Sequence, residues 1–158
     1  MRIAVVLTAN GRRGVEFAAL LAQAANEAFL QRAKAGWWAR FGRASPLLYE
    51  SGIRYAREDR CSETEELRAC SEERFVTIPE LYRIGVGDCD DLAAAYAAEA
   101  RILRGDRGAR VHVIQWRSGH YHVVVRLGDG TLADPSARLG MNKGADAKPA
   151  KADGCCGG

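Results

Sequence analysis

The chain has 158 residues, of which 47% are hydrophobic and 27% are charged. A length near 150 residues predicts a single domain, and this balance is typical of a globular protein with a buried core rather than a disordered or fibrous chain. The net charge of +3, from 23 basic and 20 acidic residues, is too small to indicate nucleic-acid binding. No apolar run approaches the roughly 20 residues that a membrane-spanning helix needs, so we expect no membrane partner.

The first residues do not have the pattern of a secretory signal. The apolar run at 3–9 is short, and Asn10-Gly11 follows it at once. The five cysteines are an odd number and are scattered along the chain, which favours a reducing compartment over a disulfide framework. We therefore expect a cytoplasmic protein, in which Cys61 and Cys70 could pair only under oxidising conditions.

Residues 15–34 form the first predicted helix. Its apolar side chains recur at intervals of three and four residues, and its polar side chains occupy the other side. The apolar set is Phe17, Leu20, Leu21, Ala24 and Ala28, and the polar set is Glu16, Gln23, Glu27 and Gln31. This periodicity is typical of an amphipathic helix.

The second half of the chain has clearer element boundaries. A short helix is predicted from Pro79, and Asp88 is a good N-cap for a longer helix that ends near Leu103. Strands are predicted at 111–116 and 120–127, followed by a hairpin turn into 131–133. This order predicts an α+β fold. We expect one domain at 1–141, mainly helical and irregular over 1–78, with a core at 79–141 and a flexible tail at 142–158.

Three residue types that thiol catalysis needs occur in order: Cys89, His122 and Asp134. Cys89 lies at the predicted start of a helix, where the backbone N–H groups and the dipole favour a thiolate. A histidine can accept the thiol proton and return it to a leaving group. An aspartate bonded to the far ring nitrogen would fix the tautomer of that histidine.

The length of the hairpin turn decides whether His122 and Asp134 can meet. A two-residue turn would place Asp134 opposite Val125, on the other face of the sheet from His122. A three-residue turn would place it opposite Val124, diagonal to His122 and on the same face. We predict the three-residue turn, with Gly130 at positive φ and a bulge. His120 lies on the same face one step farther away and is the alternative base.

These residues also match a known pattern. Around the thiol the sequence reads Gly87-Asp88-Cys89-Asp90-Asp91-Leu92-Ala93, a strand begins at His122, and the next turn reads Asp134-Pro135-Ser136. The set resembles the core of the transglutaminase-like superfamily, and less closely the compact versions encoded by tailed bacteriophages. The resemblance covers 79–141. It implies a papain-like core, in which a Cys-bearing helix packs on a small antiparallel sheet, and it implies that Cys89, His122 and Asp134 form a catalytic triad.

That resemblance implies acyl transfer or amide hydrolysis on a protein or peptide substrate. Two features of the sequence depart from the pattern. Arg83 lies six residues before Cys89, where a papain-like enzyme has a glutamine that stabilises the oxyanion. Three aspartates also surround the thiol, at positions 88, 90 and 91, and neighbouring anions oppose the thiolate that the helix start favours.

Two alternatives to an enzyme with a free thiol follow from the same residues. The fold could serve as a catalytically silent structural or interaction protein, whose partners would be other virion proteins. Cys89, His120 and His122 could instead bind zinc, but the paired spacing of structural zinc ligands is missing. No phosphate-binding loop is present either. We therefore expect no metal and no cofactor.

Overall fold

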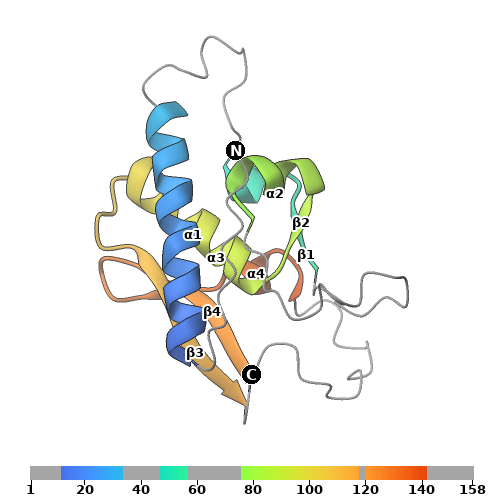
Figure 1. Cartoon of the computed structure of the whole chain (residues 1–158), viewed down its shortest axis with the longest axis vertical. Coiled ribbons are helices and arrows are strands. Elements are labelled where there is room, and N and C mark those ends of the chain that lie inside the picture. The colour runs from blue at the N-terminus through green and yellow to red at the C-terminus, as the bar shows by residue number, and fades with distance from the viewer. Residues whose placement is uncertain (1–11, 34–46, 57–75, 118–119, 142–158) are drawn as a thin grey trace.

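The computed structural model describes residues 12–33, 47–56, 76–117 and 120–141. In chain order its elements are α1 (Arg12–Arg32), the 3₁₀ turn η2 (Leu48–Glu50), β1 (Arg54–Tyr55), α2 (Ile78–Ile84), β2 (Val86–Gly87), α3 (Cys89–Ile102), β3 (Arg110–Arg117), β4 (His120–Arg126), β5 (Leu132–Ala133) and α4 (Pro135–Arg138). The mixed α+β class predicted from the sequence is confirmed (Figure 1). The predicted tail at 142–158 and the cysteines at 61, 70, 155 and 156 lie outside the described residues. Within those residues no helix has both the length and the apolar character that a bilayer crossing requires.

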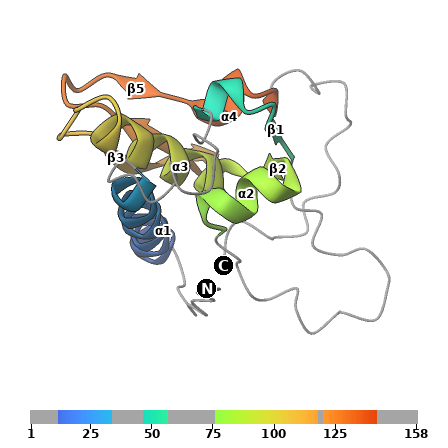
Figure 2. The same ribbon diagram turned by 90° about the horizontal axis from the view of Figure 1, so that it is seen from above.

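Helix α3 is the centre of the fold. It lies between α1 on one side and β5 with α4 on the other (Figure 2), and it packs on β3 and β4 as well. Eleven of its fourteen residues are buried, and most of these are alanines. Small side chains let the neighbouring elements approach its backbone closely, so α3 can be covered on nearly all sides. Its N-cap is Asp88, as predicted, with the carboxylate accepting a hydrogen bond from the Asp91 amide.

Helix α1 does not face the core with its larger apolar side chains, but with small side chains, Leu30 and two amides. The buried residues of α1 are Ala18, Ala19, Ala22, Gln23, Asn26 and Leu30. By contrast Phe17, Leu20 and Leu21 are 54%, 41% and 38% exposed. The predicted helix exists, but the amphipathic interpretation, in which the larger apolar side chains contact the core, is wrong.

Two buried amides explain why this face of α1 turns inward. The Gln23 side chain accepts a hydrogen bond from the backbone N–H of Val111 at 2.9 Å and so caps the outer edge of β3. The Asn26 side chain accepts one from the backbone N–H of Ile78 at 2.8 Å, at the first residue of α2. An unsatisfied buried N–H costs about 1–3 kcal/mol, so these contacts favour the side of Gln23 and Asn26 as the inner one. The buried alanines of α1 are Ala18, Ala19 and Ala22, and this helix packs on α3, whose buried residues are also mostly alanines.

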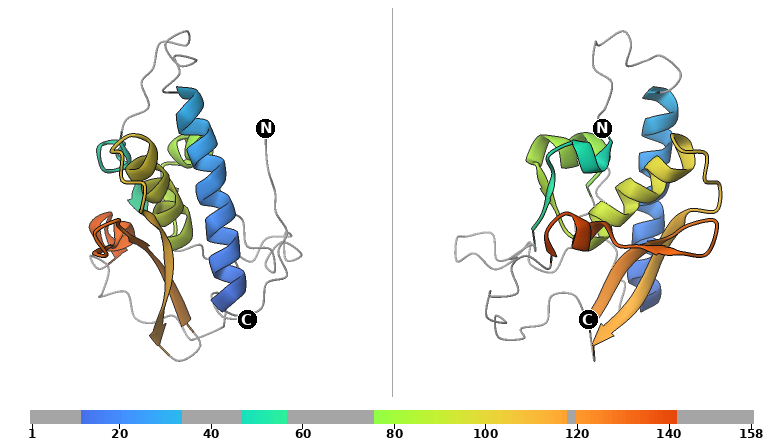
Figure 3. Two further views of the ribbon diagram at one scale, coloured as in Figure 1. Left: turned by 90° about the vertical axis from the view of Figure 1, so that its left-hand side faces the viewer. Right: turned by 180° about the vertical axis from the view of Figure 1, so that it is seen from behind.

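The larger sheet has the order β3-β4-β5 and is antiparallel. Its inner face carries valines that are buried against α1 and α3: Val111, Val113, Val123 and Val125. The two further views show how the β3–β4 hairpin extends beyond the helices, while the chain returns through β5 to α4 (Figure 3). This is the small antiparallel sheet on the Cys-bearing helix that was expected.

A second, two-stranded sheet was not predicted. β1 pairs in parallel with β2, with Arg54 opposite Val86. The backbone N–H of Tyr55 in β1 also donates a hydrogen bond to the carbonyl of Leu139, just after α4, at 3.0 Å. β1 therefore joins the segment that leads into α3 to the end of the described chain.

Candidate active site

Cys89 is the first residue of α3, directly after the Asp88 cap. Its side chain is half-buried. The first turn of a helix presents backbone N–H groups that the helix itself does not use, and the helix dipole adds to their positive potential. The thiol thus lies where negative charge is favoured, as the sequence predicted.

His122 and Asp134 are hydrogen-bonded to each other. The distance between His122 Nε2 and Asp134 Oδ2 is 2.9 Å. The side chain of His122 is 6% exposed and that of Asp134 is 28% exposed. An ion pair or hydrogen bond at this depth is screened by water far less than one on the surface.

The predicted three-residue turn explains this contact. Val125 pairs with Ala133 in the β4–β5 ladder, and continuing that register places Asp134 opposite Val124. The amide of Gly130 donates a hydrogen bond to the carbonyl of Leu127, and Gly130 has φ +88°. This is the geometry of a type I turn followed by a left-handed residue, so the predicted register is confirmed and the two-residue turn is excluded.

Asp134 is held at both of its carboxylate oxygens. Oδ1 accepts a hydrogen bond from the Ala137 amide at 3.0 Å and caps α4, while Oδ2 contacts His122. Pro135 at the first position of α4 adds a fixed φ at the same point. The carboxylate is therefore oriented before any ligand arrives.

This orientation fixes the chemistry of the imidazole. An ionised carboxylate can only accept, so the neutral imidazole that donates to Asp134 is the one with the proton on Nε2 and the lone pair on Nδ1. In that tautomer Nδ1 is the atom that can act as a base. The strand that carries His122 packs on the helix that carries Cys89.

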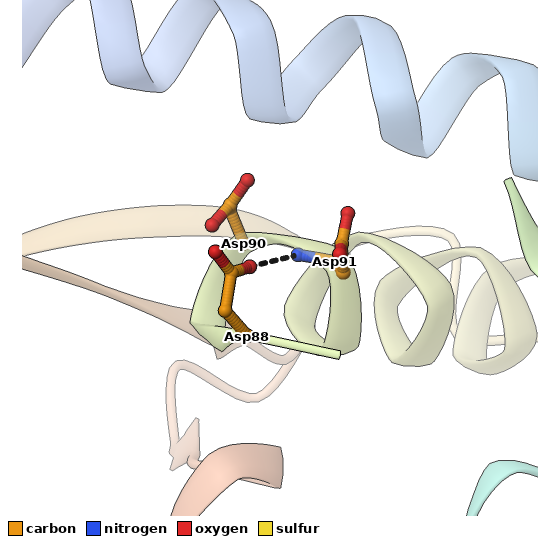
Figure 4. Close-up of side chains that lie close together, drawn as sticks. All are labelled: Asp88, Asp90 and Asp91. Atoms are coloured by element: carbon orange, nitrogen blue, oxygen red, sulfur yellow. Dashed lines mark hydrogen bonds between the residues drawn. The ribbon is translucent and has the colours of Figure 1, made fainter. Parts of the chain in front are cut away.

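The structure brings the three aspartates around the thiol together inside the protein (Figure 4). Asp88 caps the helix, and Asp91 Oδ1 accepts a hydrogen bond from the Val76 amide at 2.9 Å. Asp90 Oδ2 is buried without a hydrogen-bond partner, and its Oδ1 lies 4.0 Å from Cys89 Sγ. Burial above all, and then the carboxylate of Asp88, raise the pKa of Asp90 well above its ordinary value.

The sequence places the thiol both at a helix start, which favours a thiolate, and among aspartates, which oppose one. The raised pKa of Asp90 reduces this opposition. The raised pKa favours the uncharged form of Asp90, in which its carboxyl does not oppose a thiolate on Cys89. The same three side chains offer one oxygen each, all within 4.8 Å of one another, and such a set could hold a cation. Among the described residues this is the only such group, and the zinc alternative stays untested because it needs the side chain of His120, which lies outside the described atoms.

The remaining sequence candidates have other surroundings. His120 begins β4 opposite Arg117, and its side chain is outside the described atoms. Arg83, at the position of the expected oxyanion donor, is exposed and forms an ion pair with Glu80. The burial of Asp90 was not foreseen, because helical spacing alone does not tell which side of α3 is covered.

Comparison with protein-family models, with curated proteins and with solved structures gave no match for this chain. The resemblance to the transglutaminase-like superfamily accordingly rests on the residues around Cys89, His122 and Asp134. The contact between His122 and Asp134 is an observation independent of that resemblance.

Proposed function

We propose that this protein is a thiol-dependent acyl-transfer enzyme of transglutaminase-like type, with Cys89 as nucleophile, His122 as base and Asp134 as the residue that orients the base. The observation that carries the proposal is the 2.9 Å contact between His122 Nε2 and Asp134 Oδ2, on a strand packed against the helix that begins at Cys89. Two acid–base partners oriented in this way are common at the sites of thiol and hydroxyl nucleophiles.

The reaction would proceed in two halves. Nδ1 of His122 takes the proton from Cys89 Sγ, and the thiolate attacks the carbonyl carbon of an amide. The C–N bond breaks as the imidazolium gives its proton to the leaving amine, which leaves a thioester on Cys89. Water or a second amine then attacks the thioester carbon and passes its proton to His122. The C–S bond breaks, which releases a carboxylic acid or a new amide, and the departing thiolate recovers the proton from His122.

The surroundings of Cys89 support this chemistry. The start of α3 stabilises the thiolate and offers the backbone N–H of Cys89 as one donor to the oxyanion. Burial raises the pKa of Asp90, whose Oδ1 lies 4.0 Å from Sγ, and so disfavours a second negative charge beside the thiolate. The carboxylate of Asp134 stabilises the imidazolium that forms when the proton is transferred.

The test is the pH dependence of Cys89 alkylation by iodoacetamide, followed by peptide mass spectrometry so that the five cysteines are read separately. We expect Cys89 to react fast at neutral pH, with a thiol pKa below the ~8.5 of free cysteine. His122→Ala should slow the reaction at pH 7 about tenfold or more, because the thiolate loses its imidazolium partner. Asp134→Asn should slow it by a smaller factor.

The matched control is His112→Ala, since His112 is a half-buried histidine on the neighbouring strand β3, opposite Val124. This variant should react like the wild type. If Cys89 alkylates no faster than a free thiol and the His122 variant reacts equally, the proposed enzyme is wrong.

That negative result would support a second candidate, a binding or structural protein that retains the fold without the chemistry. One observation favours it independently of the thiol. Helix α1 presents Phe17, Leu20 and Leu21 to solvent on one side, and exposed apolar clusters often mark interaction surfaces. A virion component, as the bacteriophage resemblance implies, would use such a surface for assembly.

A further inference from the structure

The β3-β4-β5 sheet has a second face, opposite the buried valines, which we call the outer face. The strand register brings His122, Val124 and Arg126 of β4 to this face, together with Arg110 of β3 and Leu132 of β5. The candidate base His122 is therefore on the same face as Arg126. The two residues are four positions apart on one strand, a distance of about 13 Å at roughly 3.3 Å per residue.

Two arginines lie opposite each other at one end of the outer face. Arg110 pairs with Arg126 in the β3–β4 ladder, and both side chains are exposed. Among the described residues neither guanidinium has an ion pair or a hydrogen bond. Like charges directly opposite each other destabilise a sheet. The pair therefore costs stability and gains nothing from contacts within the described chain.

The carboxylates nearest to these arginines in the sequence are already used by the backbone. Asp106 accepts hydrogen bonds from the N–H groups of Gly108 and Gly128 and so joins two loops. Asp129 accepts hydrogen bonds from the N–H and the hydroxyl of Thr131. Side chains directly opposite each other have Cβ atoms about 5 Å apart, so both guanidinium groups can reach one carboxylate of a partner.

The surroundings favour a peptide carboxylate over a nucleic-acid backbone. Leu132 lies beside Arg126 in the ladder and is 55% exposed, so an apolar side chain next to the bound carboxylate would find a contact. A phosphate backbone needs a longer row of positive charges, and the net charge of the chain is only +3. A guanidinium group also matches the two oxygens of a carboxylate.

We propose that the outer face binds an acidic segment of the protein on which this enzyme acts. One carboxylate of the segment is held between Arg110 and Arg126, and an adjacent apolar side chain contacts Leu132. From there an extended segment that follows β4 reaches His122 after about four residues. The role of the bound protein as substrate rests on the proposed function, whereas the binding itself is measured without any reaction.

The first experiment measures peptide binding to the full chain by fluorescence anisotropy. The probe is a labelled ten-residue peptide with Glu-Glu-Leu at its centre, and the control peptide has Gln-Gln-Leu there. We expect the Glu peptide to bind at least tenfold more tightly, and added salt to weaken its binding. Arg110→Gln and Arg126→Gln should each weaken it about tenfold, because each removes one charge-assisted contact.

Matched controls separate lost contacts from lost structure. Arg32→Gln removes an exposed arginine of α1 and should bind the Glu peptide like the wild type. Urea unfolding of Arg110→Gln and Arg126→Gln should show midpoints no lower than that of the wild type, since each substitution removes a like-charge pair from the sheet. Weaker binding by these variants then reflects the contact itself.

The second experiment asks whether the bound segment reaches the candidate site. A saturating concentration of the Glu peptide should slow the alkylation of Cys89 by iodoacetamide several-fold. It should give no such protection in Arg126→Gln at the same concentration. Binding without protection of Cys89 would overturn the assignment of the bound protein as substrate.

Four results would overturn the binding itself. The Glu peptide fails to bind, the Gln peptide binds equally well, or the two arginine variants bind like the wild type. The fourth is a single-stranded oligonucleotide that binds more tightly than the Glu peptide with the same dependence on Arg110 and Arg126. That result would assign the outer face to nucleic acid.

These outcomes are distinguishable from a failure of the proposed function. Protection compares two alkylation rates of the same protein, so it can be read even where Cys89 reacts like a free thiol and His122→Ala changes nothing. In that case the enzyme and the substrate assignment are wrong together, while peptide binding that depends on Arg110 and Arg126 still supports an acidic partner. An activated thiol without peptide binding gives the reverse result.

Discussion

The layer that α1 forms on one side of α3 differs from the layer that η2, β5 and α4 form on the other side. On the α1 side both helices bury alanines, and the buried amides of Gln23 and Asn26 satisfy backbone groups. The opposite side relies on charges and aromatic rings: His122 bonds to Asp134, and the guanidinium of Arg138 lies 4.0 Å from the centre of the Tyr49 ring. The stability of the α1 layer should therefore depend on side-chain volume, and the stability of the opposite layer should depend on charge.

A carboxylate inside α3 supports the second layer. Glu99 accepts a hydrogen bond from the backbone N–H of Leu48 at 2.7 Å and forms an ion pair with Arg104 at 2.6 Å. Arg104 also lies over the ring of Tyr96, which stacks against Tyr49 in η2. The burial of Tyr49 raises its pKa, so the phenol stays neutral. The site residue Asp134 thus lies in the layer that is held together by charged side chains and aromatic rings.

The largest effect should come from adding volume on the α1 side. Ala19 is fully buried in the core, and Ala19→Leu adds three carbon atoms for which there is no room. Overpacking of this kind costs up to about 3 kcal/mol. Urea unfolding should show a lower midpoint, while Ala24→Leu on the exposed side of the same helix should leave it nearly unchanged. Equal midpoints for Ala19→Leu and the wild type would mean that α1 is not closely packed.

Removing the charge that supports the other side should have the next largest effect. Glu99→Ala leaves the Leu48 N–H without its acceptor and breaks the ion pair with Arg104, for a cost of about 2 kcal/mol. Thermal unfolding measures this loss. Glu99→Gln, which keeps an acceptor oxygen, should recover part of it, and identical melting of the two variants would contradict the role assigned to the hydrogen bond.

A smaller loss is expected from the amide that caps β3. Gln23→Ala removes the acceptor of the Val111 N–H, which costs about 1 kcal/mol. Hydrogen exchange of the Val111 amide should become faster than in the wild type, by more than the loss of global stability accounts for. Gln31→Ala, an exposed glutamine of the same helix, is the matched control and should change neither quantity.

The smallest change in folding stability at acid pH should come from Asp90→Asn. Unlike the three substitutions above, it should raise the stability as the pH increases. In the unfolded chain Asp90 ionises near pH 3.9, whereas burial keeps its folded-state pKa raised. Its contribution to stability is therefore complete below about pH 4 and is lost as the pH rises toward the folded pKa. Asparagine cannot ionise, so the variant should gain on the wild type between pH 4 and neutrality.

Denaturant titrations at several pH values test this slope. Asp129→Asn supplies a control of the opposite sign, because hydrogen bonds from Thr131 lower the pKa of that exposed carboxylate. Its contribution is present above the unfolded pKa and is lost as the pH falls. If the stability of Asp90→Asn stays parallel to that of the wild type over the whole range, Asp90 is ionised in the folded protein.

The parts of the fold that depend on residues close together in the sequence could be predicted from it. The Asp88 cap and the three-residue turn with Gly130 are set by local backbone geometry, and the turn alone fixed the pairing of His122 with Asp134. The inner side of α1 could not be predicted, because it depends on which distant N–H groups need acceptors. The pairing of β1 with β2 joins residues 54 and 86, and no local pattern encodes it.

The hydrogen bond from Tyr55 to Leu139 has a consequence for the order in which the chain folds. β1 has its partner in β2 only after about thirty further residues, and its second contact lies after α4. A chain synthesised from its amino end therefore cannot complete the contacts of β1 until residue 139 has been added. The helix that begins at Cys89 would form and pack against α1 first. The contacts of β1 with β2 and Leu139, beside the candidate site, would form last.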